Sequence, residues 1–263
     1  MAEITAAQVK ALRDMTGQGM MECKKALAEA GGEIEAAVDL LRKKGLIKAE
    51  KKSARQTAEG LVAVHVDSGS AAMVEVVCET DFCARNDEFK AMVQQVAALA
   101  AGGPDGDVQA TDEIDQAVQG CFAKIRENMR YSRGVKLSAA TVGRYIHHNG
   151  KVGVLVGVEG EIAPETLSDL CMHIAFTDPM AISTDEVPAD VVEREQRLAS
   201  EEAAETGKPP EIVEKIVQGK VRKFLAENAL LEQPFVKDDK KKVKQVLGQA
   251  KVTGFARFAV GEG

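Results

Sequence analysis

The feature that most constrains this chain is a pattern that occurs twice: two β-prone runs joined by a short turn, followed by a helical run. The β-prone runs span residues 61–66, 72–78, 141–147 and 151–158, and the helical runs span 88–101 and 164–176. The turn of the second pair is Asn149-Gly150, the strongest short hairpin signal. Because a hairpin needs another layer to cover its apolar face, we predict an α+β fold with two related subdomains, each a small antiparallel sheet covered by helix.

The N-terminal residues follow a helical period instead. Thr5 and Gln8 have the spacing of a capping box, so a helix is predicted to begin there and to end near Thr16–Gly19. A second helix follows, and a third is predicted from Glu33 to Lys44. We interpret residues 1–55 as a three-helix docking module that ends in a basic linker.

The remaining chain divides by the same patterns. A helix is predicted from Asp112 to Tyr131, and a Lys-rich helix from Lys240 to Leu247 precedes a last strand at Val252–Val260. Residues 183–230 carry a narrow apolar stripe on two helical runs, which favours a projecting antiparallel helical hairpin over a pair packed flat on the core. We therefore expect core subdomains at 56–135 and 136–182, the second completed by the tail strand, the helical hairpin at 183–230 and a C-terminal module at 231–263.

The charge distribution limits the range of partners. Residues 1–55 carry 11 Lys and Arg against 8 Asp and Glu, whereas the rest of the chain carries 23 against 33. The acidic majority argues against a general nucleic-acid binder, which needs a broad basic face. Seven basic side chains within residues 42–55 indicate a solvated linker or, alternatively, an RNA contact, although no aromatic residue is interleaved there to stack on bases.

The sequence gives no positive case for catalysis or for a cofactor. It contains no phosphate-binding loop, dinucleotide fingerprint or nucleophile elbow. Only His147 and His148 are close in sequence among the histidines, and strand alternation would place them on opposite faces, so no metal site is expected. Cys78 and Cys83 lack neighbours that would activate a thiol. We expect a protein that is not an enzyme.

The same features bear on the compartment. The five cysteines are odd in number and include no C-x-x-C pair, which indicates buried thiols in a reducing compartment. No apolar run approaches the roughly 20 residues of a membrane span, and no basic start followed by an apolar stretch suggests a secretory signal. We therefore expect a cytoplasmic location and no membrane partner.

One apolar side chain, Phe82, stands in a polar loop between the strand that ends at Cys78 and the helix that begins near Glu88. Two interpretations are open from the residues alone. Phe82 could fold under its own loop, or it could point outward as a wedge for a partner, since exposed apolar groups on positioned loops often mark interfaces.

Several motifs in collinear order carry a resemblance that covers essentially the whole chain. They are Arg13-x-x-Thr16-Gly17-x-Gly19-Met20-Met21-x-Cys23-Lys24-Lys25-Ala26-Leu27, Thr80-Asp81-Phe82-x-Ala84-Arg85-Asn86, His147-His148-x-Gly150-Lys151-Val152-Gly153, Gly207-Lys208-Pro209, Gln233-Pro234-Phe235 and Thr253-Gly254-Phe255-x-Arg257-Phe258. The ordered set resembles the bacterial translation elongation factor Ts family. Cys83 and Arg85 depart from the aliphatic residue and the Lys that are common in the family.

The resemblance implies a guanine-nucleotide exchange factor that binds elongation factor Tu in GDP-bound and nucleotide-free forms, with no direct nucleic-acid contact. In that family the N-terminal module, of ubiquitin-associated type, docks on the partner's nucleotide-binding domain, and the segment matching Thr80–Cys83 disturbs the partner's magnesium and phosphate site. The contact residues implied by the match are Arg13, Met20, Met21, Thr80, Asp81, Phe82, Cys83 and His147.

Asp81 has two open roles under this resemblance: repelling the phosphate by like charge, or fixing the loop by accepting backbone amides. With the resemblance added to the predicted architecture, the outward interpretation of Phe82 is favoured, with Val77 and Phe89 holding the ends of the loop. The alternatives from other classes are a basic-arm RNA-binding adaptor and a thiol- or metal-dependent enzyme.

Overall fold

The structure is a computed structural model, and it describes residues 4–16, 20–34, 36, 37, 40, 41, 57 and 59–262, without the side chains of residues 14–16. The chain divides into two compact units, residues 1–56 and 57–263. Each unit has its own hydrophobic core, so each is described separately below.

The N-terminal unit is helical. Helices α1 (Ala6–Thr16) and α2 (Met20–Glu29) pack together, and residues 34, 36, 37, 40 and 41 are also helical. The predicted capping box is confirmed: the Gln8 amide donates to Thr5 Oγ1 at 3.3 Å, and the Thr5 amide donates to Gln8 Oε1 at 2.9 Å. The turn expected at residues 17–19, the end of the third helix and the basic stretch 42–55 lie outside the described residues.

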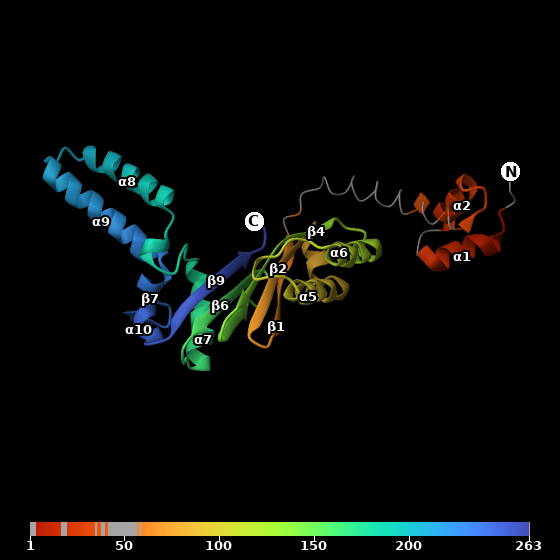
Figure 1. The fold of residues 1–263 in the computed structure, drawn as a ribbon. Helices are drawn as coiled ribbons and strands as arrows, with labels where there is room; N and C mark the ends of the chain where they lie inside the picture. Colours follow the sequence, from red (N-terminus) through yellow and green to blue (C-terminus); the bar gives the residue numbers. More distant parts are fainter. Residues whose placement is uncertain are drawn as a thin grey trace. The chain divides into compact units, whose positions relative to one another are not determined.

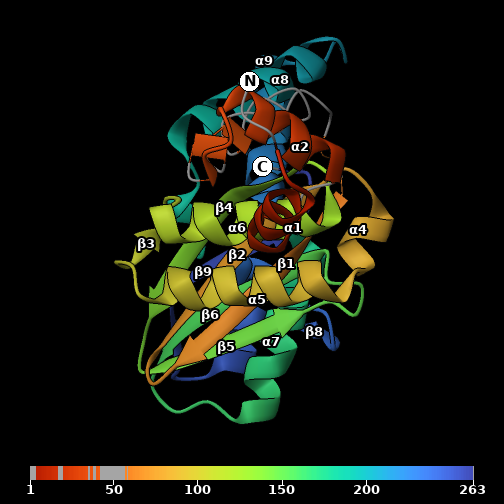
Figure 2. The same ribbon diagram turned by 90° about the vertical axis from the view of Figure 1, so that its right-hand side faces the viewer.

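The first sheet of the larger unit is antiparallel, with the strand order β1–β2–β4–β3. Its helices α5 and α6 lie side by side across one face, which Figure 2 shows in front of the strands. The elements are β1 (Glu59–Asp67), β2 (Ser70–Cys78), β3 (Gly106–Asp107), β4 (Met129–Ser138), α5 (Asp87–Ala101) and α6 (Asp112–Ile125).

The helix predicted from Asp112 to Tyr131 is wrong in its last residues. Helix α6 ends at Ile125 because Arg126 takes the left-handed conformation at φ 65°, and its amide still bonds to the Phe122 carbonyl. Strand β4 then begins at Met129 and runs through the subdomain boundary expected at 135/136. The apolar residues of this segment satisfy a helical period by coincidence, and only pairing with β2 decides in favour of a strand.

The second sheet has the strand order β5–β6–β9, so the C-terminal strand completes it, as the sequence predicts. Helices α7 and α10 pack on its outer face, and β7 and β8 form a separate small ladder. The elements are β5 (Thr141–Ile146), β6 (Val152–Glu159), β9 (Lys251–Ala259), α7 (Pro164–Thr177), α10 (Val243–Leu247), β7 (Pro234–Phe235) and β8 (Asp238–Lys242). The Lys-rich helix predicted from Lys240 therefore begins only at Val243, because Lys242 still pairs with Pro234.

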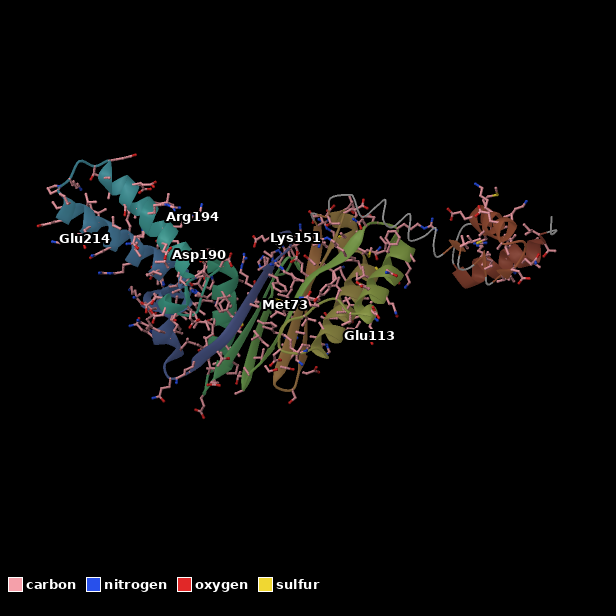
Figure 3. All side chains as sticks on the ribbon, turned by 45° about the horizontal axis from the view of Figure 1, so that its top comes forward. Met73, Glu113, Lys151, Asp190, Arg194 and Glu214 are labelled. Carbon is pink, nitrogen blue, oxygen red and sulfur yellow. The ribbon has the colours of Figure 1, made fainter. Side chains whose placement is uncertain are left out.

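The two sheets pack face to face, with helices on both outer faces (Figure 1). Met73 of β2 and Leu155 of β6 are fully buried between them, and Met73 is labelled there in Figure 3. The layers approach closely at Gly153, where an added Cβ would lie 2.5 Å from Val62 Cγ1 and 2.9 Å from Met73 Sδ. The predicted α+β class, with small antiparallel sheets covered by helices, is confirmed.

Helices α8 (Ala189–Ala204) and α9 (Pro210–Asn228) form an antiparallel pair, which Figure 1 shows standing away from the sheets of the same unit. Their contact is built from Ala199, Ala203 and Val217, whose small side chains suit a narrow seam. Charged residues such as Arg194 and Glu214 cover the pair (Figure 3). Among the described residues, no helix is both long and apolar enough to span a membrane.

Candidate functional site

The segment predicted as a polar loop is a short helix, α4 (Asp81–Arg85), so the loop prediction is corrected. Thr80 caps it: Thr80 Oγ1 accepts the Cys83 amide at 3.1 Å. Asn86 ends α4 and begins α5, since its side chain accepts the Glu88 amide at 2.8 Å. Two consecutive N-caps of the preferred Thr and Asn type therefore turn the expected loop into an ordered corner.

This corner separates the side chains of its apolar residues. Phe82 is 78% exposed, whereas Cys83 and Phe89 are buried at 2% and 0%. A one-turn helix presents its first residues on different sides, so packing of Cys83 into the core directs its neighbour outward. The interpretation in which Phe82 folds under its own loop does not fit this exposure.

A second corner, after α6, supports the first. Thr80 Oγ1 donates to Glu127 Oε2 at 2.8 Å, and the backbone amide of Asn128 donates to Glu79 Oε1 at 2.7 Å. Glu79, Glu127 and Asn128 are not among the site residues predicted from the sequence, and the last two fall within the helix predicted from Asp112 to Tyr131. The one available signal was the Asn at 128, a residue that favours turns and helix ends.

Asp81 pairs with Arg85 one helical turn later, with Oδ2 and Nη2 3.1 Å apart and both side chains exposed to solvent. The Cys83 amide is accepted by Thr80 and not by Asp81, so the bracing role considered for Asp81 belongs to its neighbour. An exposed pair of this kind contributes little to stability. Its carboxylate stays accessible beside Phe82.

The thiols beneath the corner are packed groups. All five cysteines of the chain are among the described residues, and each is a buried thiol. A hydrogen bond to Cys83, together with burial, raises the pKa of Cys78, and the same bond lowers the pKa of Cys83. Burial raises the pKa of Cys121 to about 11. Within the described ranges, no group of three His, Cys, Asp or Glu side chains is arranged to hold a metal.

His147 lies in the turn between β5 and β6, not in a strand. Its Nδ1 lies 2.8 Å from the Tyr145 hydroxyl, and its ring centroid lies 4.3 Å from that of His148. The expectation of opposite faces is thus wrong, because the strand alternation on which it rests ends at Ile146. His147 is half-buried and His148 is exposed.

The structure brings the corner and this turn to the same part of the first sheet. The turn bonds to β1, since the Val62 amide donates to the Gly150 carbonyl at 2.8 Å and Lys151 Nζ lies 2.6 Å from Glu59 Oε2. Helix α4 also contacts β1, and Glu59 pairs with Cys78 at the end of β2. Phe82 and His147 are therefore carried by segments that meet near the start of β1.

The other candidate residues belong to the N-terminal unit. Met20 and Met21, at the start of α2, are 55% and 68% exposed, and Arg13 on α1 is exposed as well. Two large exposed apolar side chains next to each other are unusual on a small module, whose core uses Cys23 and Leu27 instead.

Comparison with known proteins gives one consistent family. A family model described as Elongation factor TS matches residues 79–262. The Elongation factor Ts of Bartonella bacilliformis is 44% identical over 288 residues, covering 99% of this chain and 94% of that protein. Those of Thioalkalivibrio sulfidiphilus (45% over 274 residues, 99% and 93% covered) and Rhizorhabdus wittichii (47% over 294 residues, 100% and 94% covered) are similarly related.

Proposed function

This chain belongs to the elongation factor Ts family of translation elongation factors, and we propose that it is a guanine-nucleotide exchange factor for elongation factor Tu. In this role it binds the partner in GDP-bound and nucleotide-free forms and promotes GDP release, so that GTP can bind. No covalent bond is made or broken by such a factor, so it requires neither a catalytic centre nor a cofactor of its own.

The observation that carries this proposal is the exposure of Phe82 on a braced corner. A Phe that is 78% exposed has most of its apolar surface available for a partner, and Thr80, Glu127 and Asn128 restrict the motion of the corner that holds it. Holding the side chain in place before binding reduces the entropy that binding must overcome. Thr80–Cys83 thus supplies the wedge that disturbs the magnesium and phosphate site of the partner.

The remaining contacts divide the work of docking. Arg13, Met20 and Met21 of the N-terminal module contact the nucleotide-binding domain of the partner, and His147 contacts another of its domains. The accessible carboxylate of Asp81 stands beside Phe82 and acts on the phosphate by like charge. The helical hairpin and the C-terminal module add further contact area.

The mechanism is a linkage between two ligands of the same partner. An exchange factor that binds the nucleotide-free partner more tightly than the GDP-bound partner lowers the partner's affinity for GDP by the same ratio. Each tenfold change requires about 1.4 kcal/mol of differential free energy. Burial of one Phe side chain supplies roughly 1.5–3 kcal/mol. Phe82 therefore accounts for about one to two decades, and the docking surfaces must supply the rest.

The test is Phe82→Ala, measured by stopped-flow release of a fluorescent GDP analogue from elongation factor Tu. We expect release to slow about 10–100-fold, because that corresponds to the free energy of burying one Phe. The melting temperature should stay close to that of the unmodified protein, since Phe82 makes little contact with its own core.

The matched control is Phe176→Ala. Phe176 lies in the last turn of α7 and is 79% exposed, so the change removes the same side chain from an equally exposed place outside the proposed contacts. We expect release at the unmodified rate. Unchanged release in Phe82→Ala, or equal slowing in both variants, would remove the wedge from the proposal.

A further inference from the structure

A carboxylate is fully buried between the two sheets of the larger unit. Glu75 of β2 is 0% exposed, although charged side chains are rarely buried unless they are paired. Its neighbours Val74 and Val76 face the helices of the first sheet, whereas Met73 faces the second sheet. Strand alternation therefore directs Glu75 towards the second sheet.

An irregularity in β4 supplies its partner. The register between β2 and β4 shifts after Glu75, which pairs with Arg133 while Val76 pairs with Tyr131, so Ser132 is an extra residue. Tyr131 packs with the helix-covered core, but Val135 and Leu137 pack with the core between the sheets. A bulge of this kind turns the following side chains to the other face. Arg133 is thereby moved to the face that Glu75 occupies.

The pair then binds the end of the C-terminal strand. Arg133 Nε donates to Glu75 Oε2 at 2.6 Å, and its Nη2 donates to the Ala259 carbonyl at 3.1 Å. The guanidinium also lies over the Phe258 ring, 4.4 Å from its centroid. The second carboxylate oxygen, Glu75 Oε1, accepts the Gly261 amide at 3.0 Å. The buried carboxylate thus joins the two sheets in two ways: Oε1 bonds directly to Gly261, just after β9, and Oε2 holds Arg133, which bonds to Ala259 of β9.

Such an arrangement is better suited to orientation than to stability. A buried ion pair loses hydration on both sides, and replacement by apolar residues is often neutral for stability, whereas directional bonds fix one geometry among several packings. Apolar contacts such as Met73 with Leu155 have no preferred direction. The bonds from Glu75 and Arg133 do, and they add a fixed link at β9 to the Val62–Gly150 and Lys151–Glu59 bonds that tie β1 to the turn of the second sheet.

We propose that Glu75 and Arg133 form a clasp that, together with the bonds between β1 and the turn of the second sheet, sets the angle between the two sheets and so holds the Phe82 corner and the His147 turn in one fixed relation. The proposal rests on the proposed function, because both segments contact the same partner there. Phe82 lies in α4, which follows the strand that carries Glu75, and His147 belongs to the hairpin of the second sheet. Two contacts on one rigid body act at a high effective concentration, which falls when their relative placement varies. Glu75 and Arg133 are therefore positioning residues for exchange.

The clasp itself is tested without the partner. Spin labels on Gln116→Cys of α6 and Ser168→Cys of α7, both exposed positions on the outer helices, report the distance across the two sheets. The parent protein, whose five thiols are buried, controls for stray labelling. We expect one narrow distance distribution with Glu75 present and a broadened or shifted one in Glu75→Gln, which keeps an oxygen for the Gly261 amide but loses the charge that holds Arg133.

Two further variants separate orientation from general weakening. Arg133→Gln changes the half-exposed partner of the pair and should broaden the distance distribution in the same way. It keeps the test available if the Glu75→Gln protein does not fold. Val118→Ala trims the core under α6 without touching the clasp and should lower the melting temperature while leaving the distances unchanged. An unaltered distribution in both Glu75→Gln and Arg133→Gln overturns the clasp.

Exchange is then measured on the same variants. We expect Glu75→Gln to slow GDP release about tenfold, since small misplacements of positioned groups commonly cost this much or more. The effect should shrink strongly in the double variant with Phe82→Ala, because the clasp acts through the placement of that side chain. Broadened distances with an unchanged release rate overturn the role in exchange. Unchanged release in Phe82→Ala alone would instead overturn the proposed function and leave the distance result standing.

Discussion

The two strand-to-helix connections of the larger unit follow one plan and differ in content. The first joins β2 to α5 through Thr80, the short helix α4 and Asn86, with side-chain caps at both helix starts. The second joins β6 to α7 and reaches the helix at Pro164, where Ala163 provides no side-chain cap. The first connection presents an exposed Phe, and the second presents no large exposed apolar residue between its strand and its helix.

Under the proposed function, this difference separates a connection that carries a partner-binding side chain from one that does not. The second connection needs only to reverse the chain, and a proline with a suitable φ begins its helix. The first connection is longer and is held by groups from a distant segment, since Glu127 and Asn128 bond to Thr80 and Glu79. This bracing requires matching residues in two segments far apart in the chain. It occurs at the connection with the exposed Phe that the proposed function uses.

The largest expected effect comes from removing the apolar support of the first connection. Phe89 is fully buried at the start of α5, so Phe89→Ala leaves a cavity and should lower the free energy of unfolding by about 3–5 kcal/mol. Phe82→Ala should change it by less than about 0.5 kcal/mol, as for other exposed positions. Urea unfolding of both variants measures this contrast. Similar losses in the two would mean that Phe82 packs on its own protein in solution.

A smaller loss of stability is expected for the helix after the second connection. This helix, α7, buries a histidine, whereas α5 buries only apolar side chains. The Val236 amide donates to His173 Nδ1 at 3.2 Å, so Nε2 carries the proton and donates to Gln233 Oε1 at 2.9 Å. Burial lowers the pKa of His173 below its ordinary 6.5. The unfolded chain therefore binds more protons below about pH 6.5, and stability should fall as the pH decreases from there towards the folded pKa.

Unfolding free energies at pH 7.5 and 5.5 test this behaviour, since carboxylates remain ionised across that range. At pH 7.5, His173→Gln should lower the free energy of unfolding by about 1–3 kcal/mol, because hydrogen bonds of the histidine are broken. Between pH 7.5 and 5.5, the free energy of unfolding of this variant should fall by less than that of the unmodified protein. The same pH response in both proteins would assign the acid sensitivity to other groups.

The smallest effect concerns the caps and needs a matched pair. Thr80 caps α4 and Thr111 caps α6, each through a hydroxyl that accepts a backbone amide. Each Thr→Ala change should cost about 1 kcal/mol of unfolding free energy. Only Thr80→Ala should also slow GDP release, because only that cap orders the corner under Phe82. Equal release rates in the two variants would argue that the corner stays ordered without its cap.

The sequence predicted much of this arrangement and missed one essential part. Alternation and turn chemistry located both hairpins, and helical periodicity located α5 and α7 within a residue or so. The same periodicity carried the predicted helix past Ile125, so β4 and the bracing residues Glu127 and Asn128 were not predicted. Short polar segments follow whichever pairing the rest of the fold offers, so local patterns do not determine them.

The sequence by itself determined the α+β class, the family and the presence of an apolar side chain in a polar setting at Phe82. The class and the setting of Phe82 depend on residues close together in the chain, where periodicity and turn chemistry are visible, and the family depends on short motifs whose order runs along the whole chain. Only the tertiary structure decided that Phe82 is exposed, that Glu127 and Asn128 support its corner and that Glu75 bonds to Gly261, just after β9. These facts join segments from 47 to 186 positions apart. Contacts over such separations arise from packing, which local pattern does not encode.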